Sequence, residues 1–140
     1  MKVKCLSAEL SDEQRKKLNL WSRHRYLNVI RPGRVYTVLG ITFVRDSSVY
    51  GNGPAFDIRN DDGDCVGVPS AQFEVIDPRA SRYWIARLKD VDAFTLWPEP
   101  FYKEYFHDIL SDGAPEYVAE FERVCTLLDN EFDDESSSKR

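Results

Sequence analysis

The stretch VYTVLGITFV, residues 35–44, carries the strongest strand signal in this chain of 140 residues. It is dense in β-branched and aromatic residues, whose side chains pack well on a pleated surface and therefore favour extended backbone. Gly40 interrupts the stretch, and a glycine inside a strand is typical of a bulge or a sharp bend. The stretch therefore predicts a bent strand within a β-rich fold.

Shorter segments of strand composition follow, separated by turn signals. The Asp62-Gly63 pair suits a tight hairpin turn, and residues 91–97 fit either an edge strand or a linker. The segments are AFDIRN (55–60), CVGVP (65–69), QFEVID (72–77) and RYWIARL (82–88). Strands this short and closely spaced predict a small, strongly bent barrel or sandwich. An SH3-like barrel of five to six strands is the first expectation, and an OB-type barrel is the second.

A short helix is expected before this β-region. Ser11 and Gln14 have the spacing of a capping box, in which each side chain accepts a hydrogen bond from the other residue's backbone N–H. This pattern predicts a helix from Asp12 to about Trp21.

Two helices are expected after the β-region. Aromatic and aliphatic residues recur at helical spacing within residues 98–110, which predicts the first. In the second, an apolar stripe runs along one face of a helix that starts near Pro115. The stripe consists of Tyr117, Phe121, Val124 and Leu128.

These patterns together predict an α+β protein with one globular domain over residues 1–130. A chain of this length buries a sizeable core without disulfides or metals. The barrel is expected at about 35–97 and the C-terminal helices at about 99–130. Residues 131–140, FDDESSSKR after Glu131, predict a disordered acidic tail because they contain few apolar groups to bury.

Charge is distributed unevenly along the chain, whose net charge is -5. Residues 1–34 carry nine Lys/Arg against three Asp/Glu, and residues 35–89 carry six against seven. Residues 90–135 carry two against fourteen, a net charge of -12. Such asymmetry bears on partners rather than on fold. The acidic third is expected to attract a basic partner and to repel nucleic acid.

The three cysteines, Cys5, Cys65 and Cys125, lie far apart in the sequence and form no CxxC pair. We therefore expect buried or half-buried thiols rather than a disulfide framework or a zinc site. No apolar run approaches the roughly 18 residues of a membrane span, and the N-terminus lacks the apolar region of a secretory signal. A cytoplasmic protein without a membrane partner is expected.

No motif of reactive chemistry stands out. His24 lies in a basic loop and His107 in an aromatic-rich segment, and neither belongs to a recognisable catalytic pattern. The residues around Gly63 fail the EF-hand spacing, and the Gly-rich loop YGNGP lacks phosphate-binding spacing. We therefore expect no enzyme, no catalytic residues, no metal and no cofactor. A small hydrolase that unites either histidine with a carboxylate and a Ser or Cys is a weaker alternative.

Aromatic residues of the β-region offer a possible binding anchor. Strand alternation places Tyr83 and Trp84 on opposite faces, so one is expected in the core and the other at the surface. An exposed aromatic side chain on an SH3-like barrel suits peptide recognition.

Several stretches resemble a group of small bacterial proteins, largely uncharacterised, some of whose relatives are immunity proteins of contact-dependent growth-inhibition and polymorphic-toxin systems. The similarity covers roughly residues 2–130 and rests on structural motifs such as turns and strand cores. The stretches are MKVKC, PGRVYTVLGITF, P…QFEVID…S.YW and FY…ILSDG.PE.VAEFER. The resemblance implies a non-enzymatic protein that neutralises a toxin, and it carries over no site residue.

The charge pattern and this resemblance lead to the same expectation of a protein partner: a basic toxin domain, with nucleases among the candidates, whose cleft is occluded. We expect the contacts among the acids Glu99, Glu104, Asp108, Asp112, Glu116, Glu120 and Glu122. The alternative is an SH3-like adaptor that binds peptide or nucleic acid through the barrel and a basic N-terminal segment. That segment contains Arg15, Lys16, Lys17, Arg23, Arg25, Arg31 and Arg34.

Overall fold

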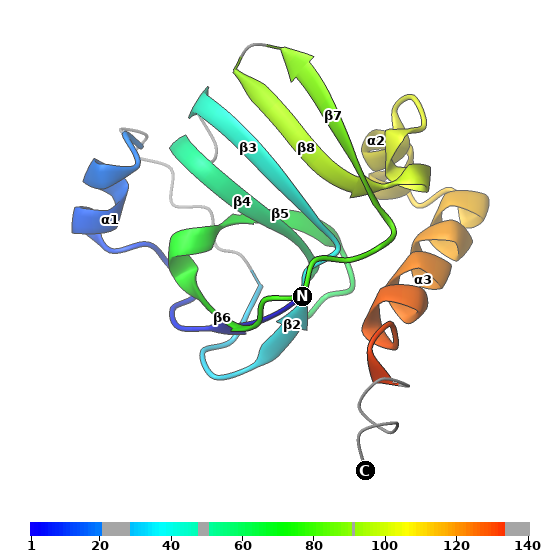
Figure 1. Cartoon of the computed structure of the whole chain (residues 1–140), viewed down its shortest axis with the longest axis horizontal. Coiled ribbons are helices and arrows are strands. Elements are labelled where there is room, and N and C mark those ends of the chain that lie inside the picture. The colour runs from blue at the N-terminus through cyan, green and yellow to red at the C-terminus, as the bar shows by residue number, and fades with distance from the viewer. Residues whose placement is uncertain (21–28, 48–50, 91, 134–140) are drawn as a thin grey trace.

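The structure is a computed structural model that describes residues 1–20, 29–47, 51–90 and 92–133. These residues form an α+β fold with two antiparallel sheets and three α-helices, which confirms the predicted class (Figure 1). The smaller sheet contains β2 (Val35–Thr37), β1 (Lys2–Cys5) and β6 (Phe73–Asp77), in that order. The larger contains, in order, β5 (Cys65–Pro69), β4 (Gly51–Arg59), β3 (Gly40–Ser47), β8 (Ala93–Pro98) and β7 (Trp84–Asp90). The α-helices are α1 (Asp12–Lys17), α2 (Phe106–Ser111) and α3 (Pro115–Asp129), with short 3-10 helices η1 (Ser70–Gln72) and η2 (Glu99–Tyr102).

Residues 35–44 are divided between the two sheets instead of forming one bent strand. β2 pairs with β1, whereas β3 pairs with β4 and β8. Between them, the Val38 N–H donates to Met1 O and the Leu39 N–H donates to Asp57 O, so the backbone stays hydrogen-bonded as it changes sheet. The predicted bend is therefore real, but it is a passage from one sheet to the other.

Gly40 is needed at this passage because of close packing. A Cβ atom at this position would lie 2.6 Å from Trp97 Cδ1 and 3.0 Å from Leu96 O. The missing side chain lets β8 approach β3 closely.

The described strands do not close into one barrel. Within the residues the structure covers, β5 and β7 are the two edges of the larger sheet, so the SH3-like classification stays a prediction. The expectation that residues 91–97 form an edge strand or a linker is wrong, because β8 lies between β3 and β7. Thr95, at the centre of β8, is fully buried, which edge position would not require.

Two hydrophobic cores flank the larger sheet. The first, here called the sheet core, lies between the two sheets; the second, the helix core, lies between the larger sheet and helices α2 and α3 (Figure 1). The sheet core contains Val3, Cys5, Ile30, Tyr36, Val38, Ile41, Phe56, Ile58, Val68 and Phe73. The helix core contains Leu39, Phe101, Phe106, Phe121, Val124, Cys125 and Leu128.

The helices follow the sequence pattern only in part. The capping box of α1 is confirmed, with Gln14 N donating to Ser11 Oγ at 3.1 Å and Ser11 N to Gln14 Oε1 at 2.9 Å. The helix ends at Lys17, earlier than expected, and the region beyond Leu20 up to residue 28 lies outside the described residues. The apolar stripe of α3 is also confirmed, since Phe121, Val124 and Leu128 are buried and Tyr117 packs on them.

The prediction of one helix over residues 98–110 is wrong. The segment contains η2 and α2, separated by Lys103 in extended conformation and Tyr105 in left-handed conformation. A continuous helix would need right-handed φ and ψ at both positions. The aromatic residues still face the core, because two short helices in different orientations bury them.

Ordered structure also continues past residue 130. Glu131 is buried, and its carboxylate accepts a hydrogen bond from the backbone N–H of Arg82 at 2.8 Å. The rest of the expected disordered tail, residues 134–140, lies outside the described residues. No helix in the described part of the chain is long and apolar enough to cross a membrane.

Candidate protein-binding surface

The seven acidic residues expected to contact a partner all lie on the segment from η2 to α3. Glu99 begins η2, Glu104 follows it, and Asp108 and Asp112 lie on α2 and its C-cap. Glu116, Glu120 and Glu122 lie on α3; Glu120 is half-buried and the other two are exposed. The structure therefore gathers the seven residues at the helical end of the molecule.

Two of these acids already have partners. Glu122 accepts from Arg59 of β4 at 2.7 Å, and Glu120 pairs with Arg123 one turn along α3. An acid held by an arginine of its own chain is a poor candidate for a second cation. The remaining five have no ion pair within the described residues, and we call them the acidic surface. They are Glu99, Glu104, Asp108, Asp112 and Glu116.

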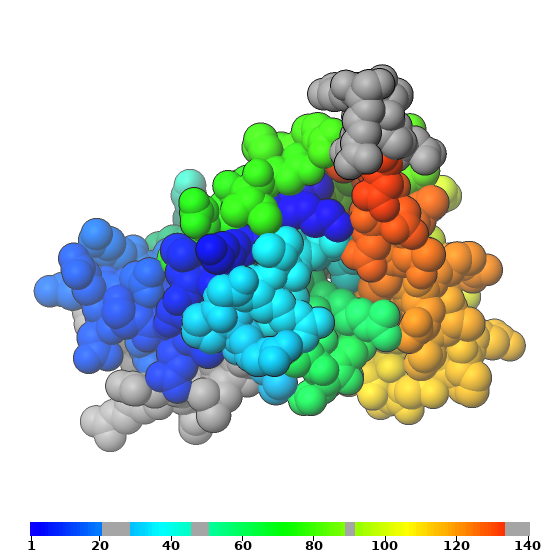
Figure 2. Space-filling view, turned by 90° about the horizontal axis from the view of Figure 1, so that it is seen from below, coloured from blue at the N-terminus to red at the C-terminus, as the bar shows by residue number. Residues whose placement is uncertain are grey.

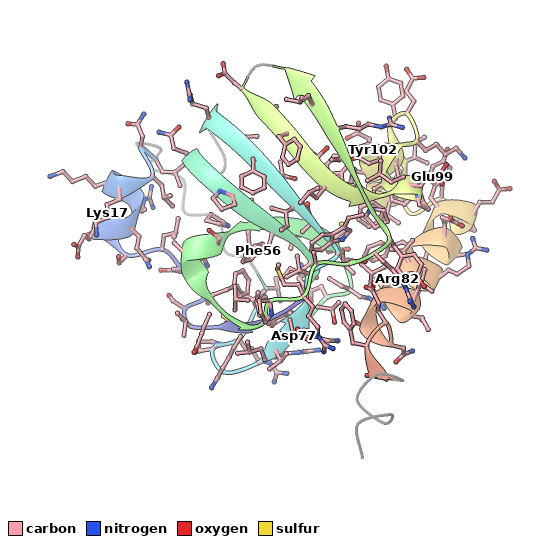
Figure 3. The ribbon with its side chains drawn as sticks, in the orientation of Figure 1. Lys17, Phe56, Asp77, Arg82, Glu99 and Tyr102 are labelled. Carbon is pink, nitrogen blue, oxygen red and sulfur yellow. The ribbon has the colours of Figure 1, made fainter. Side chains whose placement is uncertain are left out.

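Charge is separated in space as well as in sequence. Helix α1, which ends in Arg15, Lys16 and Lys17, lies at the opposite end of the molecule from α2 and α3 (Figure 2). Figure 3 shows the same separation for Lys17 and Glu99. A basic partner that approaches the molecule therefore meets the acidic end without repulsion from α1.

An open groove of about 340 Å³ runs between β7 and the segment from η2 to α2. We call it the aromatic groove, because rings of Trp97, Tyr102, Tyr105 and His107 line it. Glu104 and Asp108 of the acidic surface border it on the α2 side, and Arg87 and Leu88 border it on the β7 side. The groove thus combines apolar faces with both signs of charge at its rim.

The inner rings of the aromatic groove are held by hydrogen bonds. The indole N–H of Trp97 donates to the buried carboxylate of Asp57 at 3.0 Å, and the Tyr102 hydroxyl donates to Ile85 O at 2.6 Å. Trp97 also contacts His107 and Tyr102, with ring centroids 4.9 and 5.1 Å apart. Rings fixed in this way present a preformed surface and lose little conformational entropy on binding.

Tyr105 differs from the other rings because it is exposed and strained. The residue is 66% exposed, and it occupies the N-cap of α2 with φ 57° and ψ 24°. A left-handed conformation costs a residue with a Cβ atom about 1 kcal/mol or more. A large exposed aromatic residue kept at such a position has no evident structural benefit, and retained strain is characteristic of functional sites.

A second groove, of about 400 Å³, lies on the other side of Lys103. Phe106 and Tyr117 line it together with Glu116 and Glu120. The ammonium of Lys103 lies 4.6 Å from the centroid of the Tyr117 ring. Acidic residues therefore border both hollows of the helical end.

The possible anchors Tyr83 and Trp84 are both half-buried. They do lie on opposite sides, because Tyr83 packs on the helix core and Trp84 on the sheet core. The indole N–H of Trp84 donates to Leu39 O at 2.9 Å. Each ring therefore has an interior role, and the exposed aromatic residue at the helical end is Tyr105.

The basic N-terminal segment is less available than the sequence indicates. Arg31 and Arg34 both pair with Asp61, at 3.1 and 2.6 Å. Lys17 pairs with Glu13 at 3.7 Å, and Arg23 and Arg25 lie outside the described residues. This pairing weakens the case for a phosphate-binding face, which needs cations free to replace counterions.

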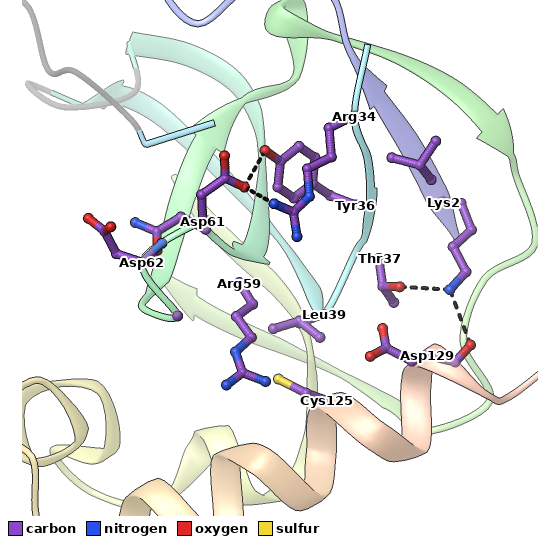
Figure 4. Close-up of a pocket in the computed structure, with 13 residues that line it drawn as sticks. Lys2, Arg34, Tyr36, Thr37, Leu39, Arg59, Asp61, Asp62, Cys125 and Asp129 are labelled. Atoms are coloured by element: carbon purple, nitrogen blue, oxygen red, sulfur yellow. Dashed lines mark hydrogen bonds and ion pairs between the residues drawn. The ribbon is translucent and has the colours of Figure 1, made fainter. Parts of the chain in front are cut away.

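A polar cavity of about 640 Å³ lies between β2, the β4–β5 turn and α3 (Figure 4). Its cations are already engaged: Arg34 with Asp61, Arg59 with Glu122, and Lys2 with Thr37 at 2.7 Å. Cys125 lines it, but burial raises the pKa of that thiol to about 12. The thiol stays protonated and unreactive at neutral pH.

The cysteines and histidines add no reactive centre among the described residues. All three cysteines are free, Cys5 and Cys125 buried and Cys65 half-buried, as expected. His107 lies within the aromatic groove, whose described lining contains no Ser or Cys. His24 lies outside the described residues, and the described side chains form no cluster of three metal ligands.

No family model, curated protein or solved structure matches this chain.

Proposed function

We propose that this chain is a non-enzymatic binding protein that neutralises a toxin domain by covering its basic cleft, as immunity proteins do. The observation that supports this proposal best is the acidic surface: five exposed carboxylates without ion pairs in the described chain, beside two grooves lined with aromatic rings. The proposal includes an SH3-like classification of the strands and a cytoplasmic location, which the free cysteines favour.

The acidic surface has two physical consequences for such a partner. Exposed carboxylates gathered at one end attract a basic cleft over a Debye length and raise the association rate. Contact then places the carboxylates against Lys and Arg side chains that would otherwise bind a nucleic acid backbone. Inhibition by this route needs no chemistry from the bound protein, only occupancy of the cleft.

The two grooves supply apolar contact surface, which the acidic side chains alone do not provide. Binding energy in protein interfaces concentrates in a few aromatic and arginine side chains at the centre, surrounded by a polar rim. Tyr105 and the rings of the aromatic groove form such a centre, and Glu104 and Asp108 form part of its rim. Specificity for one toxin would therefore come from the rings and speed of association from the acids.

A pair of charge-reversal variants tests the proposal. The first reverses the acidic surface: Glu99→Lys, Glu104→Lys, Asp108→Lys, Asp112→Lys and Glu116→Lys. The matched control reverses five exposed acids elsewhere and changes net charge equally: Glu9→Lys, Glu13→Lys, Asp62→Lys, Asp64→Lys and Glu74→Lys. Both sets are first compared by thermal unfolding, so that loss of fold is recognised.

Each protein is then co-expressed with toxin candidates encoded beside its gene, and association rates are measured by surface plasmon resonance at low and high salt. We expect the first variant to lose protection and to associate at least tenfold more slowly at low salt. The control variant should still protect cells, and its association rate at low salt should fall much less. Equal affinity for the toxin in wild type and the first variant would contradict the electrostatic mechanism.

A further inference from the structure

We propose that the aromatic groove receives the guanidinium group of an arginine from the protein partner. This inference rests on the proposed function, because it names the side chain that the partner would place beside the acidic surface. The argument depends on the shape of the groove, its free carboxylates and the position of Arg87.

The groove already holds one guanidinium. Arg87, exposed on the edge strand β7, places its guanidinium carbon 4.2 Å from the centroid of the Tyr102 ring. That separation is within the range of a cation–π contact, and a planar guanidinium stacks on rings better than an ammonium does. Arg87 therefore demonstrates that a guanidinium fits the groove, and it occupies a ring face that an incoming arginine would share.

The carboxylates of the groove are free to bind a cation. Glu104 and Asp108 line it, are exposed, and have no ion pair within the described residues. Lys103 also lines the aromatic groove, but its ammonium contacts the ring of Tyr117, which belongs to the second groove, and within the described chain it forms no ion pair with either carboxylate. A second guanidinium would consequently find a ring on which to stack and a carboxylate, whose two oxygens can accept two parallel hydrogen bonds from it.

The competing occupant is a carboxylate of an acidic partner, which Arg87 itself would bind. The two occupants make opposite demands on Arg87. If an arginine enters, Arg87 competes for Tyr102 and repels the newcomer, so its removal tightens binding. If a carboxylate enters, Arg87 is the cation that β7 contributes to the described lining of the groove, so its removal weakens binding.

The probes are three capped tripeptides, Gly-Arg-Gly, Gly-Lys-Gly and Gly-Glu-Gly, together with a Gly-citrulline-Gly control that has the shape of the arginine peptide but no charge. Each is titrated into the isotope-labelled full chain while the indole N–H of Trp97 and the backbone N–H of Tyr105 are followed by NMR. We expect the arginine peptide to shift these two signals, the lysine peptide to bind more weakly, and the citrulline and glutamate peptides to leave them unchanged.

Variants of the groove distinguish the two occupants by whether affinity for the arginine peptide rises or falls. Arg87→Ala should tighten the arginine peptide about two- to fivefold, the factor that one exposed cation–π contact is worth. Glu104→Gln with Asp108→Asn should weaken it by a similar factor. Asp62→Asn with Glu74→Gln, a matched pair of exposed acids outside both the groove and the acidic surface, should leave it unchanged. All of these substitutions are at exposed positions and should keep the fold, which the remaining NMR signals verify.

Weaker binding after Arg87→Ala, equal binding of the arginine and citrulline peptides, or no shift at saturating peptide would overturn the inference. These outcomes are separate from failure of the proposed function. A toxin that still depends on the acidic surface while no arginine peptide enters the groove contradicts only the inference. A toxin indifferent to charge reversal contradicts the proposed function itself.

Discussion

The buried carboxylate of Asp57 organises the base of the aromatic groove. Asp57 is 7% exposed, lies on β4, and accepts hydrogen bonds from the Trp97 indole N–H and the Thr42 hydroxyl, both at 3.0 Å. It therefore joins β4, β3 and β8 through side chains as well as backbone. Gly40 lies beside this contact and leaves room for the Trp97 ring. The orientation of Trp97, and with it the floor of the groove, depends on a residue that no partner would touch.

Replacing Asp57 by alanine should lower the free energy of unfolding by about 1–3 kcal/mol, because the half-buried Thr42 hydroxyl and Trp97 indole N–H lose the acceptor that they share, although Thr42 Oγ1 still lies 3.3 Å from the indole nitrogen. Asp57→Asn should cost less, since both bonds end on one oxygen, Oδ2, and the amide oxygen of asparagine can take that position. Urea denaturation followed by tryptophan fluorescence measures both changes. Asp112→Ala, an exposed carboxylate at the end of α2, is the control and should change stability by less than about 0.5 kcal/mol. A cost for Asp57→Ala as small as the control's would show that the carboxylate is dispensable.

At the scale of single elements, the sequence predicted correctly those features that depend on residues close together along the chain. The capping box of α1, the stripe of α3 and the strands β5 and β6 depend on nearest neighbours along the chain, and all are found where expected. The division of residues 35–44 into β2 and β3 has another cause. It is decided by which strands lie alongside, β1 for one half and β4 and β8 for the other. Composition carries no information about those partners.

The candidate site shows the same limit. Counting charges was enough to locate the acidic segment, because exposure of carboxylates is the ordinary outcome. Pairing of Glu122 with Arg59 joins residues 63 apart in sequence, so no local pattern indicates it. The aromatic groove was missed because Trp97, Tyr102 and His107 come from three elements whose packing is tertiary. The helical spacing of these aromatic residues was the one signal in the sequence, and it indicated that they pack in a core, not that some of them line a groove at the surface.

Tyr105 allows stability and binding to be separated at the start of α2. Asn tolerates the left-handed conformation and is a favoured N-cap, so Tyr105→Asn should stabilise the fold by about 0.5–1 kcal/mol. Little burial is lost, because Tyr105 as a residue is 66% exposed. Under the proposed function the same change removes a central contact and should weaken toxin binding tenfold or more. Thermal unfolding and surface plasmon resonance on one preparation measure both quantities.

Tyr105→Phe is the matched control: it keeps the ring and the strain, and should keep most of the affinity. A variant Tyr105→Asn that is less stable than wild type would contradict the strain argument. Unchanged toxin affinity would instead remove Tyr105 from the interface.

At the scale of the whole molecule, the two ends of the described chain are tied to each other. Lys2 of β1 donates to Asp129 O at the end of α3, at 3.1 Å. Just beyond α3, Glu131 accepts from the backbone N–H of Arg82, which precedes β7. These two contacts link the C-terminal end of α3 to the smaller sheet through β1 and to the larger sheet through the segment before β7. Helix α3 carries one border of the acidic surface, so its docking also fixes the spacing of the candidate site.

Glu131→Ala should loosen this docking. The side chain of Glu131 is 1% exposed, and its removal leaves the Arg82 N–H without its acceptor, at a cost of about 1–3 kcal/mol. Relative to wild type, we expect amide hydrogen exchange to accelerate more in α3 than in β3 and β4, because the lost bond joins α3 to the sheets and not the sheets to each other. Asp129→Ala, an exposed carboxylate at the negative end of the same helix dipole, should leave exchange unchanged or slower. Exchange that accelerates equally in every strand and helix would mean that α3 and the sheets open as one unit, and that Glu131 stabilises the whole fold rather than the position of α3.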